Sequence, residues 1–181
     1  MNPIRRPACW QRPRMTSMKF KSLALACLLG LSLTAWAQRD VELLDWKEVE
    51  VAPPPTFDAS KLLDLEMSVN SSLQFGVDPA SLSISSDGVV RYVIVASNAS
   101  GARNVFYEGI RCATGEYKTY ARYTPEGRWV KAENAEWRSM FGNMPSKHAL
   151  QFARAGACNN AAPTLSVGEI VRHLKGSRLN P

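Results

Sequence analysis

Hydrophobic and polar residues alternate with a period of two through most of the chain between residues 71 and 133, the pattern of half-buried β-strands. Turn residues separate the runs, and Asp87-Gly88 is the clearest hairpin signal because glycine accepts the positive φ of a tight turn. Connections this short leave no room for crossover helices, so the pattern predicts an antiparallel meander of four to six strands. The alternating runs cover residues 71–77, 81–85, 89–97, 103–112, 117–124 and 128–133.

Two helices are predicted after the strands, because the apolar spacing changes to three and four residues. The first covers residues 146–156, and its final glycine is placed as a stop. The second covers residues 165–176, with Ser166 as N-cap and Glu169 as its capping-box partner. The predicted fold class is therefore α+β, a single domain over residues 62–181 with both C-terminal helices packed on one face of the sheet.

Residues 38–61 are predicted to form a short N-terminal helix followed by a proline-rich connector. Amphipathic spacing favours the helix over residues 38–50, with apolar anchors that include Leu44 and Trp46. The run Pro53–Pro55 ends this helix, since proline lacks the N–H donor and fixes an extended path.

Residues 1–37 have the organisation of a secretory signal peptide. A basic head precedes an apolar run of eleven residues, 23–33, and a small-x-small pattern ends at Ala37. We therefore predict cleavage between Ala37 and Gln38. The position of the basic head makes Met18 a better start than the first methionine.

Export predicts a periplasmic protein. The apolar run is about half as long as the roughly 20 residues that a membrane-spanning helix needs, and no later segment is comparably apolar. The mature chain is thus expected not to be transmembrane. Two alternatives stay open, which are an uncleaved membrane anchor and a lipid attached at Cys27.

The excess of basic residues belongs to the predicted signal segment. The whole chain has a formal net charge of +6, and all six excess basic residues precede Gln38. The mature chain is therefore neutral, which gives no support for nucleic-acid binding. Its charge is still uneven, at −7 over residues 38–87 and +7 over residues 88–181, and this split predicts that one half lies against the other.

The mature chain keeps two cysteines, Cys112 and Cys158, which are 46 residues apart. An even pair in an oxidising compartment favours a disulfide, and closing such a loop stabilises a fold by roughly 4 kcal/mol. The alternative is a Cys112 thiolate activated by His148, as in nucleophilic catalysis. No C-x-x-C motif is present to keep such a thiol reduced.

Motifs for catalysis and for cofactor binding are missing from the sequence. His148 and His173 do not have the spacing of a metal site, and neither a nucleophile elbow nor a phosphate-binding loop is present. Glu108 and Glu116 are interpreted as solvated residues of a hairpin. We expect no cofactor and lean against an enzyme. A hydrolase of an envelope polymer, with Cys112 or a carboxylate as the reacting group, is kept as the alternative.

The strand alternation, subject to register, places six basic and aromatic residues on one face of the sheet. Aromatic rings between cationic groups suit the binding of sugars and of anions. The leading hypothesis is a non-catalytic module that binds an envelope protein or an anionic glycan; the competing interpretation is that the acidic N-terminal half covers this face. The six residues are Arg91, Tyr107, Arg111, Lys118, Tyr120 and Arg122.

The segment Val90 to Arg122, "VRYVIVASNASGARNVFYEGIRCATGEYKTYAR", lies between "DWKEVEVAPPP" and "GRWVKAENAEWR". With its Ser-Gly-Ala, Asn-Val-x-Tyr-Glu-Gly-Ile-Arg-Cys and Thr-Gly-Glu motifs, it resembles the cryptic neisserial protein-like family of bacterial envelope proteins. The resemblance covers roughly residues 41–175. It implies an exported protein of unknown activity, with some members associated with the outer membrane, and it carries over no catalytic or ligand-binding residue.

Overall fold

The sheet and the helices belong to the second of two units into which the chain divides, Met1–Trp46 and Lys47–Pro181. The predicted signal segment and its cleavage position between Ala37 and Gln38 lie outside the described residues. The residues that the computed structural model describes are 45–67, 71–144 and 146–176.

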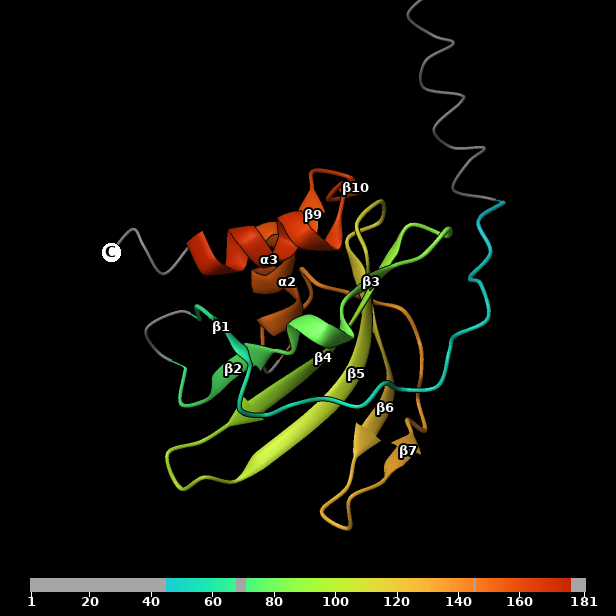
Figure 1. Ribbon diagram of the computed structural model, residues 1–181. Helices are drawn as coiled ribbons and strands as arrows, with labels where there is room; N and C mark the ends of the chain where they lie inside the picture. The colour runs from blue at the N-terminus through green and yellow to red at the C-terminus, as the bar shows by residue number, and fades with distance from the viewer. Residues whose placement is uncertain (1–44, 68–70, 145, 177–181) are drawn as a thin grey trace, which may run out of the picture. The chain divides into compact units, whose positions relative to one another are not determined.

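The main sheet is antiparallel throughout, as the alternation predicts (Figure 1). Its strands follow the order β1-β2-β4-β5-β6-β7, while β3 pairs with β4 and β8 pairs with β6. The strands are β1 (Leu63–Leu65), β2 (Gln74–Val77), β3 (Ser83–Ile84), β4 (Val89–Ser97), β5 (Arg103–Arg111), β6 (Glu116–Tyr123), β7 (Trp129–Lys131) and β8 (Arg138–Ser139).

The prediction of four to six strands is wrong. Within the described ranges the main sheet has eight strands, and a separate two-stranded ribbon joins β9 (Cys158–Asn159) to β10 (Ala162–Pro163). The strands that the sequence pattern missed, such as β1 and β8, have two or three residues. An alternating pattern cannot be recognised over so short a run, and pairing with a neighbour defines these strands instead.

Two short helices near the C-terminus are confirmed. α2 covers His148–Phe152 and continues into a π-type turn at Ala153–Ala157, where Gly156 has a φ of +123°. α3 covers Val167–Gly176, and the predicted cap is present because Glu169 N donates to Ser166 Oγ at 3.2 Å. None of the helices in the described ranges combines the length and the apolar character that a membrane crossing requires.

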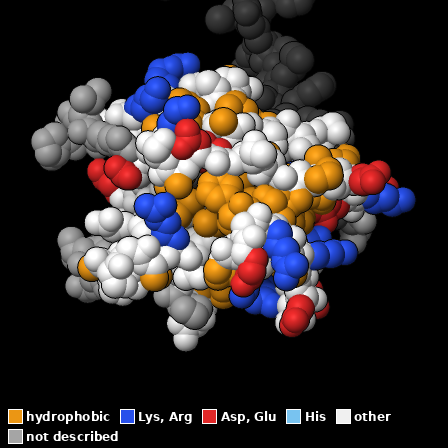
Figure 2. All heavy atoms as spheres, turned by 60° about the horizontal axis from the view of Figure 1, so that its bottom comes forward, with side chains coloured by type: hydrophobic (Ala, Val, Ile, Leu, Met, Phe, Trp, Pro, Cys, Tyr) orange, Lys and Arg blue, Asp and Glu red, His pale blue; other side chains and the backbone are white. Residues whose placement is uncertain are grey.

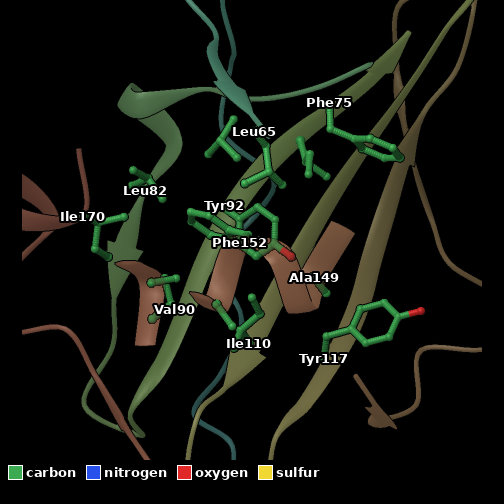
Figure 3. Close-up of a cluster of buried hydrophobic side chains, with 14 of the residues drawn as sticks. Leu65, Phe75, Leu82, Val90, Tyr92, Ile110, Tyr117, Ala149, Phe152 and Ile170 are labelled. Carbon is green, nitrogen blue, oxygen red and sulfur yellow. The ribbon is translucent and has the colours of Figure 1, made fainter. Parts of the chain in front are cut away.

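Both helices pack on one face of the sheet and form the larger hydrophobic core (Figure 3). The rings of Tyr92 on β4 and Phe152 on α2 lie 4.5 Å apart between centroids. Ile170 and Leu174 of α3 are buried in the same cluster with Ile110 of β5. This layer follows directly from the alternation, because every second residue of β4 and β5 points to the helices.

The opposite face of the sheet carries a smaller core, which is covered by residues 47–57, named here the strap. The strap crosses β4, β5 and β6 without regular structure (Figure 1). Val51 and Phe57 of the strap pack against a buried cluster that includes Tyr107 and Tyr120. Residues 45–50, the described part of the helix predicted over 38–50, are not helical. Glu48 of the strap instead contacts Lys118 and Tyr120 of the sheet.

The predicted disulfide between Cys112 and Cys158 is confirmed, with a Cα–Cα distance of 5.7 Å. Cys112 follows β5 directly, and Cys158 begins β9 in the connection between α2 and α3. The bond thus ties the helical segment to the end of a central strand.

Candidate functional site

Five of the six residues predicted to share a sheet face lie on the face that the strap crosses. They come from three adjacent strands, and the strand register places them on that side. They are Arg91 of β4, Tyr107 and Arg111 of β5, and Lys118 and Tyr120 of β6.

The placement of Arg122 on this face is wrong, and a β-bulge is the reason. Tyr107 pairs with Ala121 while the next residue, Glu108, pairs with Thr119, so β6 has one extra residue at Tyr120. Beyond the bulge the alternation is reversed. The Arg122 guanidinium lies 5.6 Å above the ring of Phe106, which belongs to the core on the helix side of the sheet.

The ring of Tyr120 lies against the backbone at Gly109, the residue opposite Lys118 on β5. A Cβ atom at Gly109 would stand 2.6 Å from Tyr120 Oη and 2.9 Å from Val89 Cγ1. The absence of a side chain at this position therefore allows the ring to lie across the sheet. In this position the Tyr120 hydroxyl donates to Glu48 Oε1 at 2.7 Å.

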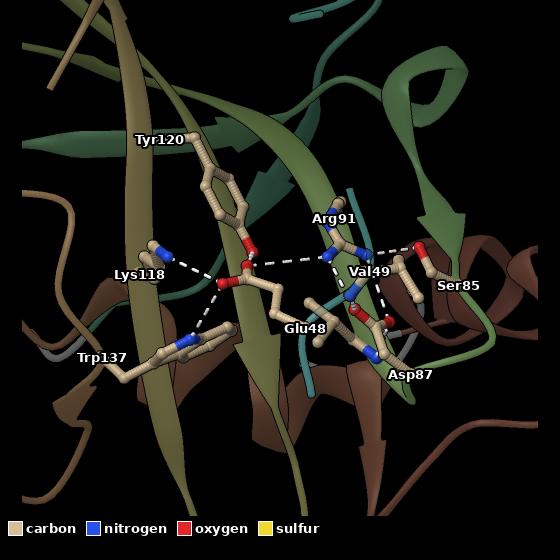
Figure 4. Close-up of polar contacts among 9 residues, drawn as sticks. Glu48, Val49, Ser85, Asp87, Arg91, Lys118, Tyr120 and Trp137 are labelled. Atoms are coloured by element: carbon tan, nitrogen blue, oxygen red, sulfur yellow. Dashed lines mark hydrogen bonds and ion pairs between the residues drawn. The ribbon is translucent and has the colours of Figure 1, made fainter. Parts of the chain in front are cut away.

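The Glu48 carboxylate of the strap is the point where the donors of this face meet (Figure 4). Lys118 Nζ donates to Glu48 Oε2 at 2.7 Å, and Trp137 Nε1 donates to the same oxygen at 3.4 Å. Arg91 Nη2 lies 3.7 Å from Oε1. Burial by itself raises the pKa of Glu48, but the hydrogen bonds from Lys118 and Tyr120 outweigh it and lower that pKa. The carboxylate is therefore ionised in a ready-made anion site.

Arg91 is held by a second carboxylate. Its Nη2 donates to Asp87 Oδ2 at 2.8 Å, its Nη1 also contacts Ser85 Oγ, and the side chain is only 3% exposed. Val49 N of the strap also donates a hydrogen bond to Asp87 Oδ2, at 3.1 Å. Arg91 is thus a structural cation. Glu48 and Asp87, both from the acidic range 38–87, pair with Lys118 and Arg91 of the basic range 88–181.

A groove of about 520 Å³ runs between the strap and β6–β7. Pro53 and Pro54 of the strap line the groove together with Tyr107, Trp129, Lys118 and Lys131. Figure 2 shows the face toward the β4–β5 and β6–β7 loops, where hydrophobic side chains gather in the middle with both basic and acidic side chains around them. Aromatic rings and two amines therefore meet in one accessible hollow, and Lys118 belongs both to this hollow and to the Glu48 site.

Replacing Gly109 with alanine is expected to lower the free energy of unfolding by about 1–3 kcal/mol, because the added methyl displaces the Tyr120 ring and the strap with it. Urea denaturation measures the effect. Gly168→Ala in α3 is the matched control. A Cβ added at Gly168 would lie 4.0 Å from Ser166 Oγ, an ordinary contact distance, and alanine favours a helix. Equal stability of Gly109→Ala and the wild type would contradict the role given to this glycine.

A second polar cluster is buried on the helix side of the sheet. Glu108 is 2% exposed, so its interpretation as a solvated residue is wrong. The Glu108 carboxylate accepts hydrogen bonds from Tyr92 Oη at 3.0 Å, Thr119 Oγ1 at 2.9 Å and His148 Nε2 at 2.8 Å. His148 Nδ1 lies 2.9 Å from Ser146 Oγ. Burial by itself lowers the pKa of His148, but the Glu108 charge outweighs it and raises that pKa.

This cluster changes the interpretation of His148. The histidine is bound to Glu108 and Ser146, and Cys112 is bonded to Cys158. The alternative in which His148 activates a Cys112 thiolate therefore lacks its thiol. Over the described ranges, no group of three or more His, Cys, Asp or Glu side chains is arranged to hold a metal ion.

The interpretation that the acidic range 38–87 covers the face that the strap crosses agrees with the contacts of Glu48, but sequence reasoning identified neither this residue nor the two tryptophans of the site. Glu48 is one of ten acidic residues in that range, and the charge split did not single it out. Trp129 lies in the predicted run 128–133, but nothing in the sequence related it to this site, and Trp137 lies in a loop.

Comparison with known proteins gives one family and one relative. The model of the CNP1-like family matches residues 42–175. Cryptic neisserial protein 1 of Neisseria gonorrhoeae (strain ATCC 700825 / FA 1090) is 27% identical over 183 residues, covering 84% of this chain and 90% of the relative. No solved structure matches the chain significantly. The matched range includes the strap, the sheet, both helices and every residue that lines the groove.

Proposed function

Because the chain belongs to the CNP1-like family, whose description names no activity, we propose from the groove that it is a non-catalytic binding module. Its ligand is an anionic glycan, held in the groove between the strap and β6–β7. We further propose that the mature protein works in the periplasm, in association with the outer membrane. The signal-peptide organisation of residues 1–37 supports export, and the association with the outer membrane is what the family resemblance implies.

The observation that carries the proposal is the composition of the groove. Trp129 offers a partly exposed aromatic ring, and aromatic rings suit the apolar faces of sugars. Lys118 and Lys131 offer ammonium donors for carboxylate or phosphate groups. Lys131 is exposed and has no acidic partner among the described residues, so a ligand anion meets no internal competitor at that amine.

The rival hypothesis of an envelope-polymer hydrolase has less support. Cys112 is in the disulfide, which removes the thiol that this hypothesis named as one possible reacting group. Glu108 is buried under three hydrogen bonds on the other side of the sheet from the groove. Neither group is placed to react with a ligand in the groove.

Replacing Lys131 with methionine is expected to weaken the binding of oligogalacturonate roughly fivefold, the effect of about 1 kcal/mol from one solvent-accessible ion pair. Methionine keeps most of the apolar stem and removes the charge. Isothermal titration calorimetry at 0.15 M salt measures the affinity, with the neutral maltohexaose as the ligand control.

Lys175→Met is the matched protein control, because Lys175 is an exposed lysine of α3 outside the groove. It removes the same charge and is expected to leave the affinity within about twofold of wild type. If Lys131→Met and Lys175→Met weaken the binding of oligogalacturonate equally, the net charge of the protein explains the effect, and a specific role of Lys131 in the groove is refuted. Equal binding of the neutral and the anionic oligosaccharide would refute an anion-selective groove.

A further inference from the structure

The Glu48 site has the properties of a ligand site filled by the chain itself. Its donors, Lys118, Tyr120 and Trp137, come from the sheet and from the loop before β8. The carboxylate that they bind comes from a segment outside the sheet, 70 residues away in sequence from Lys118. Such convergence of an ammonium, a hydroxyl and an indole N–H on one carboxylate is how proteins bind anionic ligands.

The strap that carries Glu48 is attached mainly through side chains. Among the described residues its backbone makes one hydrogen bond, from Val49 N to Asp87. The run Pro53–Pro55 has no N–H groups and cannot pair with a strand. A segment with few backbone hydrogen bonds opens at a lower free energy than the sheet beneath it.

The anion site and the groove share two residues. Lys118 and Tyr120 bind Glu48 and also line the hollow in which we place the glycan. A ligand carboxylate that reaches this end of the groove therefore competes with Glu48 for the same donors. The exchange of one carboxylate for another leaves no buried cation unpaired, so it avoids the usual cost of opening such a site.

We propose that Lys118, Tyr120 and Trp137 form the carboxylate subsite of the groove, and that Glu48 occupies it as an internal competitor until the carboxylate of a glycan displaces that of Glu48 from these donors. This inference rests on the proposed function and adds to it the ligand class, a uronate-bearing glycan, and the residues that bind its carboxylate. It also assigns the strap a role in setting the affinity.

The decisive variant is Glu48→Gln, which keeps the size of the side chain and removes its charge. The matched control is Glu50→Gln, because Glu50 is an exposed strap residue and its substitution changes the net charge equally. Each protein is titrated with oligogalacturonate by calorimetry at 0.15 M salt. We expect Glu48→Gln to bind about tenfold more tightly than wild type, since competition lowers apparent affinity by the fraction of open sites. Glu50→Gln is expected to stay within about twofold.

A second measurement follows the strap without any ligand. Acetylation of Lys118 is compared with that of the exposed Lys175 in the same molecule by mass spectrometry. In wild type, Lys118 is expected to react more slowly because Glu48 holds it; in Glu48→Gln the difference between the two lysines is expected to shrink several-fold.

The outcomes separate the inference from the function on which it rests. If Glu48→Gln and Glu50→Gln bind equally tightly, the internal competitor is ruled out while the groove remains a binding site. If neither wild type nor Glu48→Gln binds the probe, the proposed function fails. If Lys118 is also acetylated equally fast in wild type and in Glu48→Gln, the protection of Lys118 by Glu48 is refuted as well. Binding by Glu48→Gln together with weak or no binding by wild type supports the inference directly.

Discussion

Replacing Glu108 with alanine is expected to lower the free energy of unfolding by about 3–5 kcal/mol, the cost of breaking a buried ion pair by removing one partner. His148 would stay buried beside Phe75 and Tyr117, whose ring centroids lie 5.3 and 5.8 Å from its own. It would also lose the acceptor at 2.8 Å. Tyr92, which is fully buried, would lose the acceptor of its hydroxyl as well.

Urea denaturation followed by circular dichroism measures this loss. Glu116→Ala is the matched control, because Glu116 is a partly exposed glutamate on the neighbouring strand, 3.8 Å from Arg111. An ion pair of that kind contributes at most about 1 kcal/mol. A Glu108→Ala variant no less stable than Glu116→Ala would show that the buried cluster does not support the fold.

The same pair predicts a pH dependence. The pKa of His148 is raised in the folded protein above its ordinary value of 6.5, so the folded state binds a proton more tightly than the unfolded chain. The resulting stability is fully present below pH 6.5 and is lost as the pH rises through the folded pKa. Unfolding curves across this range should show the decline in wild type and a smaller decline in Glu108→Ala.

Loss of the disulfide is expected to lower the free energy of unfolding by about 4 kcal/mol, because the bond closes a loop with a sequence separation of 46 residues. Cys158→Ser, Cys112→Ser and the double variant should lose nearly the same amount, since one bond is absent in each. Reduction of wild type before unfolding provides an independent comparison. A Cys158→Ser variant as stable as the oxidised wild type would contradict the structural role of the bond.

The loss of Glu108 and the loss of the disulfide affect the same part of the molecule. Glu108 lies on β5 and binds His148, while Cys112 follows that strand directly and is bonded to Cys158. The segment from α2 to β9 is therefore attached to one strand at both of its ends. Since the two contacts hold one segment, their losses are expected to be coupled and the double variant to deviate from additivity.

The sequence by itself determined the local elements of this protein. Strand alternation indicated β2 to β7, glycines marked their turns, Ser166 marked the start of α3, and the pair Cys112 and Cys158 favoured a disulfide. These features depend on neighbouring residues or on a simple count. They can be read without knowledge of how the strands pair.

Only the tertiary structure decided which side chains meet. The bulge at Tyr120 depends on the pairing of β6 with β5, and one extra residue was enough to move Arg122 to the other face. The strap is not helical because its side chains have partners on the sheet, and Glu48 meets Lys118 across 70 residues. The sequence pattern alone led to the interpretation of Glu108 as a solvated residue, whereas in the folded protein α2 places His148 against its carboxylate. Contacts between distant segments leave no periodic pattern in the sequence, because the packing of the folded chain, and not the local backbone, brings them together.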